Sequence, residues 1–363
     1  MRRAGCNPQI TLRIEHAQVN NHVADNRRMS NAPHPYTALT PDSVMQAMTD
    51  LGLWPDGRLL AMGSYENRVY RAHLDEPVQG HNAVVLKFYR PGRWTRAQIL
   101  EEHAFAHALV ADEVPAVAPL VLHGQTLHHF EGFDFAISPM RGGRPPELDD
   151  LEVLEWMGRF LARLHNTGAK RAFEHRASLS VERLAQEPAQ WLLQQQAIPL
   201  EVERAWREAY EALLPLLQTQ LAGMDRALIR VHGDCHPGNV LWTPTDLPHG
   251  GPHFVDLDDA CMGPAVQDLW MLLSGDRHQR TLQLSALLDG YEQVRDFDRR
   301  QLGWIEGLRT LRLVHYSAWL ARRWSDPTFP IHFPWFGTPD YWRGQVHMLH
   351  EQLEALQEDP LVV

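Results

Sequence analysis

Two carboxylates and one amide stand at spacings that suit chemistry on a metal-bound phosphate. Asp234 lies five residues before Asn239, and an apolar run later in the chain ends at Asp256. A carboxylate can orient a hydroxyl group and accept its proton, while an amide oxygen and a second carboxylate can hold Mg²⁺. Pro237-Gly238 supplies the sharp turn that lets both loop side chains face the same point. This spacing is typical of loops that catalyse phosphoryl transfer, and it makes Asp234 and Asp256 candidate catalytic residues.

The carboxylates that follow Val255 suit a metal site. Alternation along a strand places Asp258 on the same face as Asp256, where it could contribute. Mg²⁺ is the expected ion because Asn239 and Asp256 offer hard oxygen ligands and ATP supplies more. A solvated acidic turn is the alternative interpretation, and it is stronger for Asp259 than for Asp256.

Two histidines beside the candidate catalytic residue suggest a different metal. His232 and His236 flank Asp234, and histidines with carboxylates also bind transition metals. Phosphoryl transfer accounts for Asp234 and Asn239 together, so zinc is the weaker interpretation, and His232 is expected to pack beside the loop and brace it. Cys235 has no neighbouring base, and we expect no nucleophilic role for it.

A small sheet is expected before residue 139. Lys87 lies near the end of residues 83–89, the clearest strand in the sequence because apolar and β-branched residues dominate it. The other elements expected here are strands at 58–62, 67–71, 120–123 and 134–138 and a helix at 95–111. The sequence thus predicts a small antiparallel sheet with one inserted helix, and Lys87 on one of its strands.

Gly and Pro cluster at residues 139–146, which is the best linker candidate. Beyond it, apolar residues recur at helical spacing. Helices are expected at 151–168, 181–195, 200–222, 265–274, 280–295, 298–323 and 339–357, with one hairpin at 240–242 and 253–255. The predicted fold class is therefore α+β, with an N-terminal lobe at 39–139 and a helical C-terminal lobe at 140–363. Residues 1–38 are rich in Asn and His without periodicity, and they are expected to form a flexible arm.

Composition limits the function further. The chain has 363 residues, enough for a sizeable core, and 44% of them are hydrophobic. A formal net charge of −11 argues against nucleic-acid binding, because a phosphate backbone demands a basic face. No apolar run reaches the roughly 20 residues that span a membrane, and the start lacks a signal-peptide pattern. Three cysteines are too few for a disulfide framework, so a cytoplasmic monomer is expected.

Several motifs follow one another in a recognisable order. At the candidate catalytic end they are HGDCHPGN at 232–239, FVDLDDA at 254–260 and GPAVQDLW at 263–270. Nearer the N-terminus they are SYENRVY at 64–70, KFYRP at 87–91 and ILEEH at 99–103. Together they resemble the aminoglycoside phosphotransferase and choline kinase superfamily, which has a protein-kinase-like two-lobed fold, and within it the bacterial stress response kinase A family. The resemblance covers roughly residues 42–357.

The resemblance implies that ATP and Mg²⁺ are the cofactors and assigns roles to matching residues. Asp234 would accept the proton of the acceptor hydroxyl. Asn239 and Asp256 would bind Mg²⁺. Asp268 resembles the acidic residue that braces the catalytic loop in such folds.

The same resemblance implies a nucleotide site in the N-terminal lobe. Lys87 would pair with the phosphates of ATP and be held by a glutamate, for which Glu102 is favoured over Glu101. The other residues expected to contact ATP are Ser64 and Asn67 in the loop over the phosphates and Met140 at the hinge. This loop lacks the GxGxxG pattern of protein kinases, so its backbone contacts with phosphate are not predicted by sequence.

The identity of the acceptor stays open at this stage. The family resemblance implies a serine or threonine of a protein, whereas the motifs specify only the phosphate-donor side. A small-molecule kinase acting on an amino alcohol, sugar or aminoglycoside is the main alternative, and the acidic net charge would suit a cationic acceptor. A nucleotide-binding pseudokinase is a third possibility, against which the retention of Lys87, Asp234, Asn239 and Asp256 argues.

Overall fold

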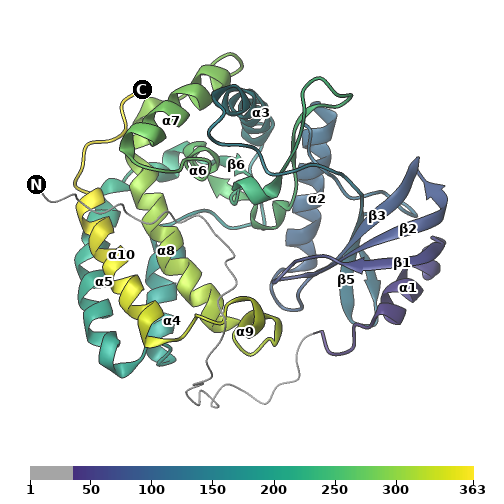
Figure 1. Ribbon diagram of the computed structural model, residues 1–363, viewed down its shortest axis with the longest axis horizontal. Helices are drawn as coiled ribbons and strands as arrows, with labels where there is room; N and C mark the ends of the chain where they lie inside the picture. Colours follow the sequence, from purple (N-terminus) through teal and green to yellow (C-terminus); the bar gives the residue numbers. More distant parts are fainter. Residues whose placement is uncertain (1–35) are drawn as a thin grey trace, which may run out of the picture.

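The computed structural model describes residues 36–363, which form a sheet-rich part joined to a larger helical part (Figure 1). For description, residues 36–139 are the sheet part and residues 140–363 the helical part. Of the predicted arm, residues 1–35 lie outside the described residues, whereas Tyr36 is buried. The Tyr36 hydroxyl lies 3.2 Å from the carbonyl oxygens of Glu66 and Phe88, so the chain is attached to the sheet from the first described residue onward.

Five antiparallel strands form the main sheet, in the order β1-β2-β3-β5-β4. They are β1 (Pro55–Ala61), β2 (Arg68–Val78), β3 (His81–Phe88), β4 (His128–Phe130) and β5 (Phe133–Pro139). On β3, the buried Val84, Leu86 and Phe88 alternate with residues of the other face, to which Lys87 belongs. Helix α1 (Pro41–Asp50) packs on the first of these faces. Helix α2 (Arg96–Ala111) lies between the sheet and the helical part (Figure 1).

The prediction of a strand at residues 120–123 is wrong. Leu120 donates its N–H to the carbonyl of Ile137 at 2.7 Å, but the chain then turns back at His123, whose φ is 51°. The partner of β5 is instead β4, which begins at His128. Leu120 and Leu122 are buried in the sheet core, so their apolar character reflects burial in a loop rather than a strand.

The helical part contains the following helices: α3 (Leu151–Ala169), η1 (Glu182–Gln186), α4 (Glu187–Gln194), α5 (Leu200–Gln220), η2 (Met224–Ala227), α6 (Val266–Trp270), α7 (Arg277–Tyr291), η5 (Arg299–Trp304), α8 (Ile305–Arg322), α9 (Thr328–His332) and α10 (Pro339–Ala355). Two short strand pairs accompany them, β6 (Ile229–Val231) with β9 (Cys261–Gly263) and β7 (Val240–Thr243) with β8 (Gly251–Phe254). The turns η3 (Pro237–Asn239) and η4 (Leu257–Asp259) complete the set.

Most of the predicted helices and the predicted hairpin are confirmed with shifts of up to four residues at their ends, whereas the helix predicted at 265–274 is only the five-residue α6. Strands β6 and β9 and helix α9 were not predicted, because three to five residues are too few for a periodic pattern. Of the helices in residues 36–363, none is long and apolar enough to cross a membrane.

Helices α3 and α7 approach each other backbone to backbone. A Cβ atom on Gly158 would stand 1.9 Å from the carbonyl oxygen of Leu287, and one on Gly290 would stand 1.9 Å from that of Glu155. Only glycine permits this approach, because any side chain at either position would force the helices apart. The contact sets the relative position of two residues further along these helices, His165 and Tyr291.

Candidate active site

Asp234 and Asn239 lie together on the loop between β6 and β7. The loop turns through η3, where the Nδ1 atom of His236 accepts the N–H of Gly238 at 3.0 Å. The Asn239 side-chain amide donates to the Asp234 carbonyl oxygen at 3.0 Å and lies 3.5 Å from the carboxylate oxygen Oδ2. The amide nitrogen of Asn239 therefore faces Asp234, and its oxygen remains for another ligand.

Asp268 braces this loop from α6, as the family resemblance implied. Its fully buried carboxylate accepts the backbone N–H groups of His232 at 2.8 Å and Gly233 at 2.9 Å. Nε2 of His165 lies 3.1 Å from the same carboxylate, and Nδ1 of His165 lies 2.9 Å from the Tyr291 hydroxyl. Through these two contacts His165 links α3 and α7 to the loop.

The hydrogen bonds of the Asp268 carboxylate lead to a prediction about the stability of the protein. Replacing Asp268 by Ala leaves two loop N–H groups and His165 without their acceptor in a dry environment, at a cost of about 3 kcal/mol. The measurement is the free energy of unfolding from urea titration. Asp289→Ala, an exposed residue of α7, is the matched control and should change it by less than about 0.5 kcal/mol. A loss below about 1 kcal/mol for Asp268→Ala would contradict the bracing role.

Asp256 and Lys87 meet across the two parts of the molecule. Asp256 follows β8 with φ 58°, a left-handed conformation that begins η4. Its Oδ1 atom accepts a hydrogen bond from Nζ of Lys87 at 2.7 Å, and Oδ1 of Asp258 lies 2.8 Å from the same Nζ. Because Val255 donates its N–H to the Asn239 carbonyl at 3.0 Å, the two candidate metal ligands stand on adjoining segments.

Asp258 joins the sheet part to the helical part rather than pointing to solvent. Its buried carboxylate accepts from the Asn67 side chain at 2.5 Å and from Arg93 at 3.0 Å, in addition to the Lys87 contact. Burial alone would raise the pKa of Asp258, but the charges of Lys87 and Arg93 hold it well below its usual range. Asp259, the predicted solvated residue, is half exposed and pairs with Arg93 at 2.8 Å.

The two glutamates of α2 have separate surroundings. Glu101 accepts three backbone N–H groups, those of residues 174–176, and so attaches α2 to the helical part. Glu102 is buried on the side of Lys87, and burial raises the pKa of its carboxyl to about 7 against the opposing charge of Lys87. Its Oε2 atom has no hydrogen-bond partner among residues 36–363, and the ion pairs of Lys87 are with Asp256 and Asp258. The preference for Glu102 over Glu101 thus agrees with the geometry, although a direct ion pair with Lys87 is not formed.

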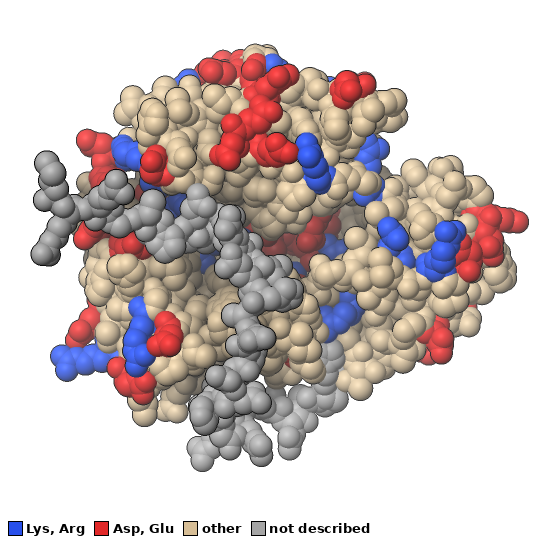
Figure 2. Space-filling model, viewed as in Figure 1, with Lys and Arg blue, Asp and Glu red and all other residues tan. Residues whose placement is uncertain are grey.

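The motifs of the sequence thus converge on one region. Figure 2 shows acidic and basic side chains in the hollow where the sheet part and the helical part meet. Lys87 contacts Asp256, Asp256 adjoins Asn239 through Val255, and Asn239 contacts Asp234.

Known proteins share these features over almost the whole chain. Residues 57–305 match the phosphotransferase enzyme family. Stress response kinase A of Escherichia coli (strain K12) is 44% identical over 333 residues, which cover 92% of this chain and 98% of that protein. Serine/threonine protein kinase RdoA of Salmonella typhimurium (strain LT2) matches with the same identity and coverage. The chain belongs to the stress response kinase A family. It is a phosphotransferase, a kinase.

Solved structures agree on the fold. Amicoumacin kinase hAmiN has a TM-score of 0.66 at 17% identity, with 88% of this chain and 95% of that chain covered. A microcompartment-associated aminopropanol kinase has a TM-score of 0.66 at 19% identity, with 86% and 97% covered. Choline kinase from Cryptosporidium parvum has a TM-score of 0.56 at 14% identity, with 82% and 89% covered. At these identities the likeness concerns the fold alone, and it confirms the predicted protein-kinase-like α+β architecture.

The remaining predicted nucleotide residues of this kinase lie in the sheet part and at the first residue of the helical part. The Asn67 side chain is fully engaged, since its oxygen accepts the N–H of Arg90 at 3.1 Å and its amide donates to Asp258. Ser64 stands in the loop between β1 and β2, partly exposed. Met140 follows β5 and donates its N–H to the Ala83 carbonyl at 3.1 Å, so this N–H faces β3.

Sequence reasoning missed an arginine on the candidate base. Nη1 of Arg312, on α8, lies 2.5 Å from Oδ1 of Asp234. Burial would raise the pKa of Asp234, but the charges of Arg312 and His236 lower it below its ordinary value. Nothing in the sequence distinguishes Arg312 from the other arginines of α8, so no signal could have indicated the contact.

Sequence reasoning also missed a group of ion pairs between the sheet part and the helical part. Asp326, fully buried before α9, lies 2.7 Å from Arg90 and 3.1 Å from Arg68. Glu66 accepts from the Trp319 indole at 2.7 Å and pairs with Arg323 of the α8 end. The loop over the predicted phosphate site is therefore fastened to the C-terminal helices.

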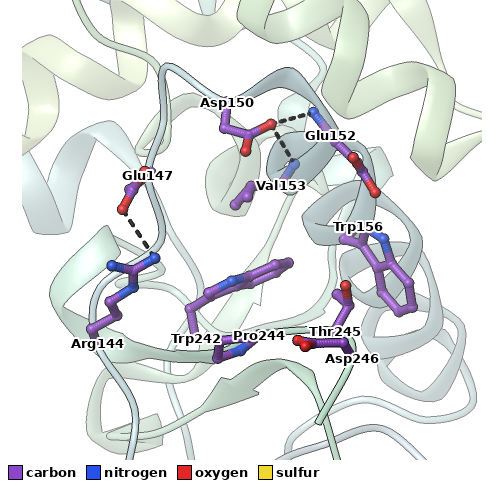
Figure 3. Close-up of a pocket in the computed structure, with 10 residues that line it drawn as sticks. All are labelled: Arg144, Glu147, Asp150, Glu152, Val153, Trp156, Trp242, Pro244, Thr245 and Asp246. Carbon is purple, nitrogen blue, oxygen red and sulfur yellow. Dashed lines mark hydrogen bonds and ion pairs between the residues drawn. The ribbon is translucent and has the colours of Figure 1, made fainter.

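A separate cavity of about 200 Å³ lies beside the linker (Figure 3). Trp156 and Trp242 form part of its wall. Glu147 pairs with Arg144 at 3.1 Å, and Asp150 caps the start of α3. None of the predicted site residues lines this cavity, so we assign it no part in the reaction.

Proposed function

We propose that this kinase transfers the γ-phosphoryl group of ATP, bound with Mg²⁺, to a serine or threonine hydroxyl of a protein. The observation that carries the proposal is the continuous set of contacts from Lys87 through Asp256 and Asn239 to Asp234. Phosphoryl transfer requires a cation that binds phosphate, two oxygen ligands for the metal and a carboxylate base.

The residues present fit a magnesium ion. The Asp256 carboxylate is half exposed, and the Asn239 oxygen is not used by the loop, so two hard oxygen ligands face the region where phosphates would lie. Bound Mg²⁺ would supply charge neutralisation on the phosphate oxygens. Among residues 36–363, no group of three or more His, Cys, Asp or Glu is placed to hold a metal alone, which agrees with a site completed by nucleotide oxygens and disfavours zinc.

Lys87 can change partners without losing charge compensation. It now pairs with Asp256 and Asp258, while the unpartnered Oε2 of Glu102 lies buried on its side. If Asp256 turns to the metal, Asp258 and Glu102 still hold Lys87 toward the phosphates. The Ser64 hydroxyl would add a donor from the loop above, and the backbone around Met140 would receive the adenine.

Asp234 supplies the base. Its charge is maintained by Arg312, which contacts Oδ1. The Oδ2 atom, with longer contacts to Asn239 at 3.5 Å and His236 at 3.6 Å, would accept the hydrogen bond of the acceptor hydroxyl. In a loose transition state the carboxylate mainly orients the hydroxyl and receives its proton late.

The name of the Salmonella relative supports a protein acceptor, since that protein is called a serine/threonine protein kinase. A small-molecule acceptor stays the alternative, because the fold is shared with kinases named for small substrates. A pseudokinase is disfavoured by the complete set of contacts.

One experiment separates these functions. ATP labelled at the γ-phosphate is offered with Mg²⁺ and two acceptor pools, denatured cell proteins and a metabolite panel. We expect label on serine and threonine of the protein pool, and its loss with Asp234→Asn. Label confined to metabolites would establish the small-molecule alternative, and nucleotide binding without label in either pool would establish a binding module.

A further inference from the structure

One face of α8 extends from the candidate base to the loop over the phosphate site. Arg312, Tyr316, Trp319 and Arg323 follow one another at helical spacing. Arg312 contacts Asp234 at one end, and Trp319 and Arg323 contact Glu66 at the other. An acceptor whose hydroxyl reaches Asp234 therefore lies beside this face.

Two arginines of this face are paired with carboxylates, Arg312 with Asp234 and Arg323 with Glu66. Arg312 and Arg323 are its charged residues, and the neighbouring His315 is neutral because burial lowers its pKa to about 4. Glu306, earlier on the same helix, is engaged by Arg280 at 3.0 Å and Arg309 at 3.1 Å. Among residues 36–363, the carboxylate that pairs with Arg312 is that of Asp234.

Arg312 has unused hydrogen-bonding capacity. Its side chain is 43% exposed, and only Nη1 bonds to Asp234, while no other described residue accepts from Nε or Nη2. A guanidinium group offers donors in a rigid fork that matches a carboxylate. A second carboxylate, carried by the acceptor, can therefore bind the outer edge of Arg312 while Nη1 keeps Asp234 in place.

An acceptor with a positive group beside its hydroxyl would be repelled by Arg312 rather than bound by it. Its ammonium or guanidinium would stand within a few ångström of Arg312, where like charges repel and the pairing with Asp234 would be disturbed. The net charge of −11 suggests a cationic acceptor, but Arg312 next to Asp234 opposes a positive group beside the acceptor hydroxyl.

We infer that Arg312 selects acceptor hydroxyls that have a carboxylate close by, that is, serine or threonine flanked by aspartate or glutamate. This inference rests on the proposed protein-kinase function and names the class of sequence it prefers. Arg312 acts as a specificity-determining residue, in addition to holding Asp234.

The test uses three pools of peptides that share a central serine in a random background. The residues flanking the serine are Glu in one pool, Gln in the second and Lys in the third. The kcat/KM of each pool is measured for the parent protein, Arg312→Gln and Arg312→Glu. Arg322→Gln is the matched control, because Arg322 is an exposed arginine of α8 that lies 5.1 Å over the Trp191 ring, away from Asp234.

We expect the parent to favour Glu flanks over Lys flanks by about tenfold or more. Arg312→Gln should reduce this ratio to about 2 or less, Arg312→Glu should invert it, and Arg322→Gln should preserve it. A residue that merely holds Asp234 would lower all three rates equally and leave the ratio unchanged, so an unchanged ratio in Arg312→Gln overturns the inference.

Failure of the inference and failure of the proposed function give different results. Equal phosphorylation of the three pools, or a preference for Lys flanks, overturns the specificity role and leaves a protein kinase. No label in any peptide pool, with label in the metabolite panel, overturns the protein acceptor and the inference with it.

Discussion

Replacing Asp234 by Asn is expected to lower kcat about a thousandfold or more while the fold remains intact. Asparagine has nearly the shape of aspartate but can neither accept the acceptor proton nor attract Arg312. The pair is partly exposed, with side chains 21% and 43% accessible, so its loss costs little stability. The measurements are steady-state turnover and urea denaturation of the same preparation.

The control for this change is Asp225→Asn, which removes a charge from an exposed position in η2 and should leave turnover unaltered. Turnover of Asp234→Asn within about tenfold of the parent would assign the base role to another residue. A loss of stability above about 2 kcal/mol would instead mean that the loop has collapsed, and the kinetic result would then not report on chemistry.

Replacing Asp256 by Asn should weaken Mg²⁺-dependent ATP binding about tenfold or more and lower kcat by about a hundredfold. Position 256 has φ 58°, which asparagine adopts more easily than alanine, so Asn removes the charge without adding backbone strain. Lys87 keeps Asp258 as its second partner, so the two parts stay joined.

The measurement is ATP affinity by thermal shift or calorimetry over a range of Mg²⁺ concentrations. Asp246→Asn, in the exposed turn between β7 and β8, is the control and should retain the parental Mg²⁺ dependence. If Asp256→Asn shows that same dependence, Asp256 is not a ligand. Asp256→Ala should behave like Asn in binding and in addition lose about 1 kcal/mol of stability, because alanine at this φ is strained.

The convergence that sequence could foresee concerns candidate site residues separated by a short spacing. Asp234 and Asn239 share one loop, so their convergence could be foreseen from five positions of separation and a Pro-Gly turn. The brace at Asp268 followed from the family resemblance, and its contacts agree, whereas the preference for Glu102 over Glu101 stays a prediction. The longer helices were predictable because each shows periodicity over several turns.

The contacts that sequence could not supply join segments far apart in the chain. Arg312 stands 78 residues after Asp234, and Asp326 stands 236 residues after Arg90. Their partners depend on how distant segments pack against one another, which no local pattern encodes. The prediction of a strand around Leu120 failed for a related reason, since a buried loop can have the same apolar composition as a buried strand.

The glycine contact between α3 and α7 limits which substitutions this protein can tolerate. Through His165 and Tyr291, the spacing of two helix backbones determines where the Asp268 carboxylate meets the loop. A methyl group at Gly158 or Gly290 would alter that spacing and carry the error to Asp234, although neither glycine touches a reactant. Tolerance to mutation should therefore be lowest at two small residues remote from the chemistry, as well as at the charged groups that perform it.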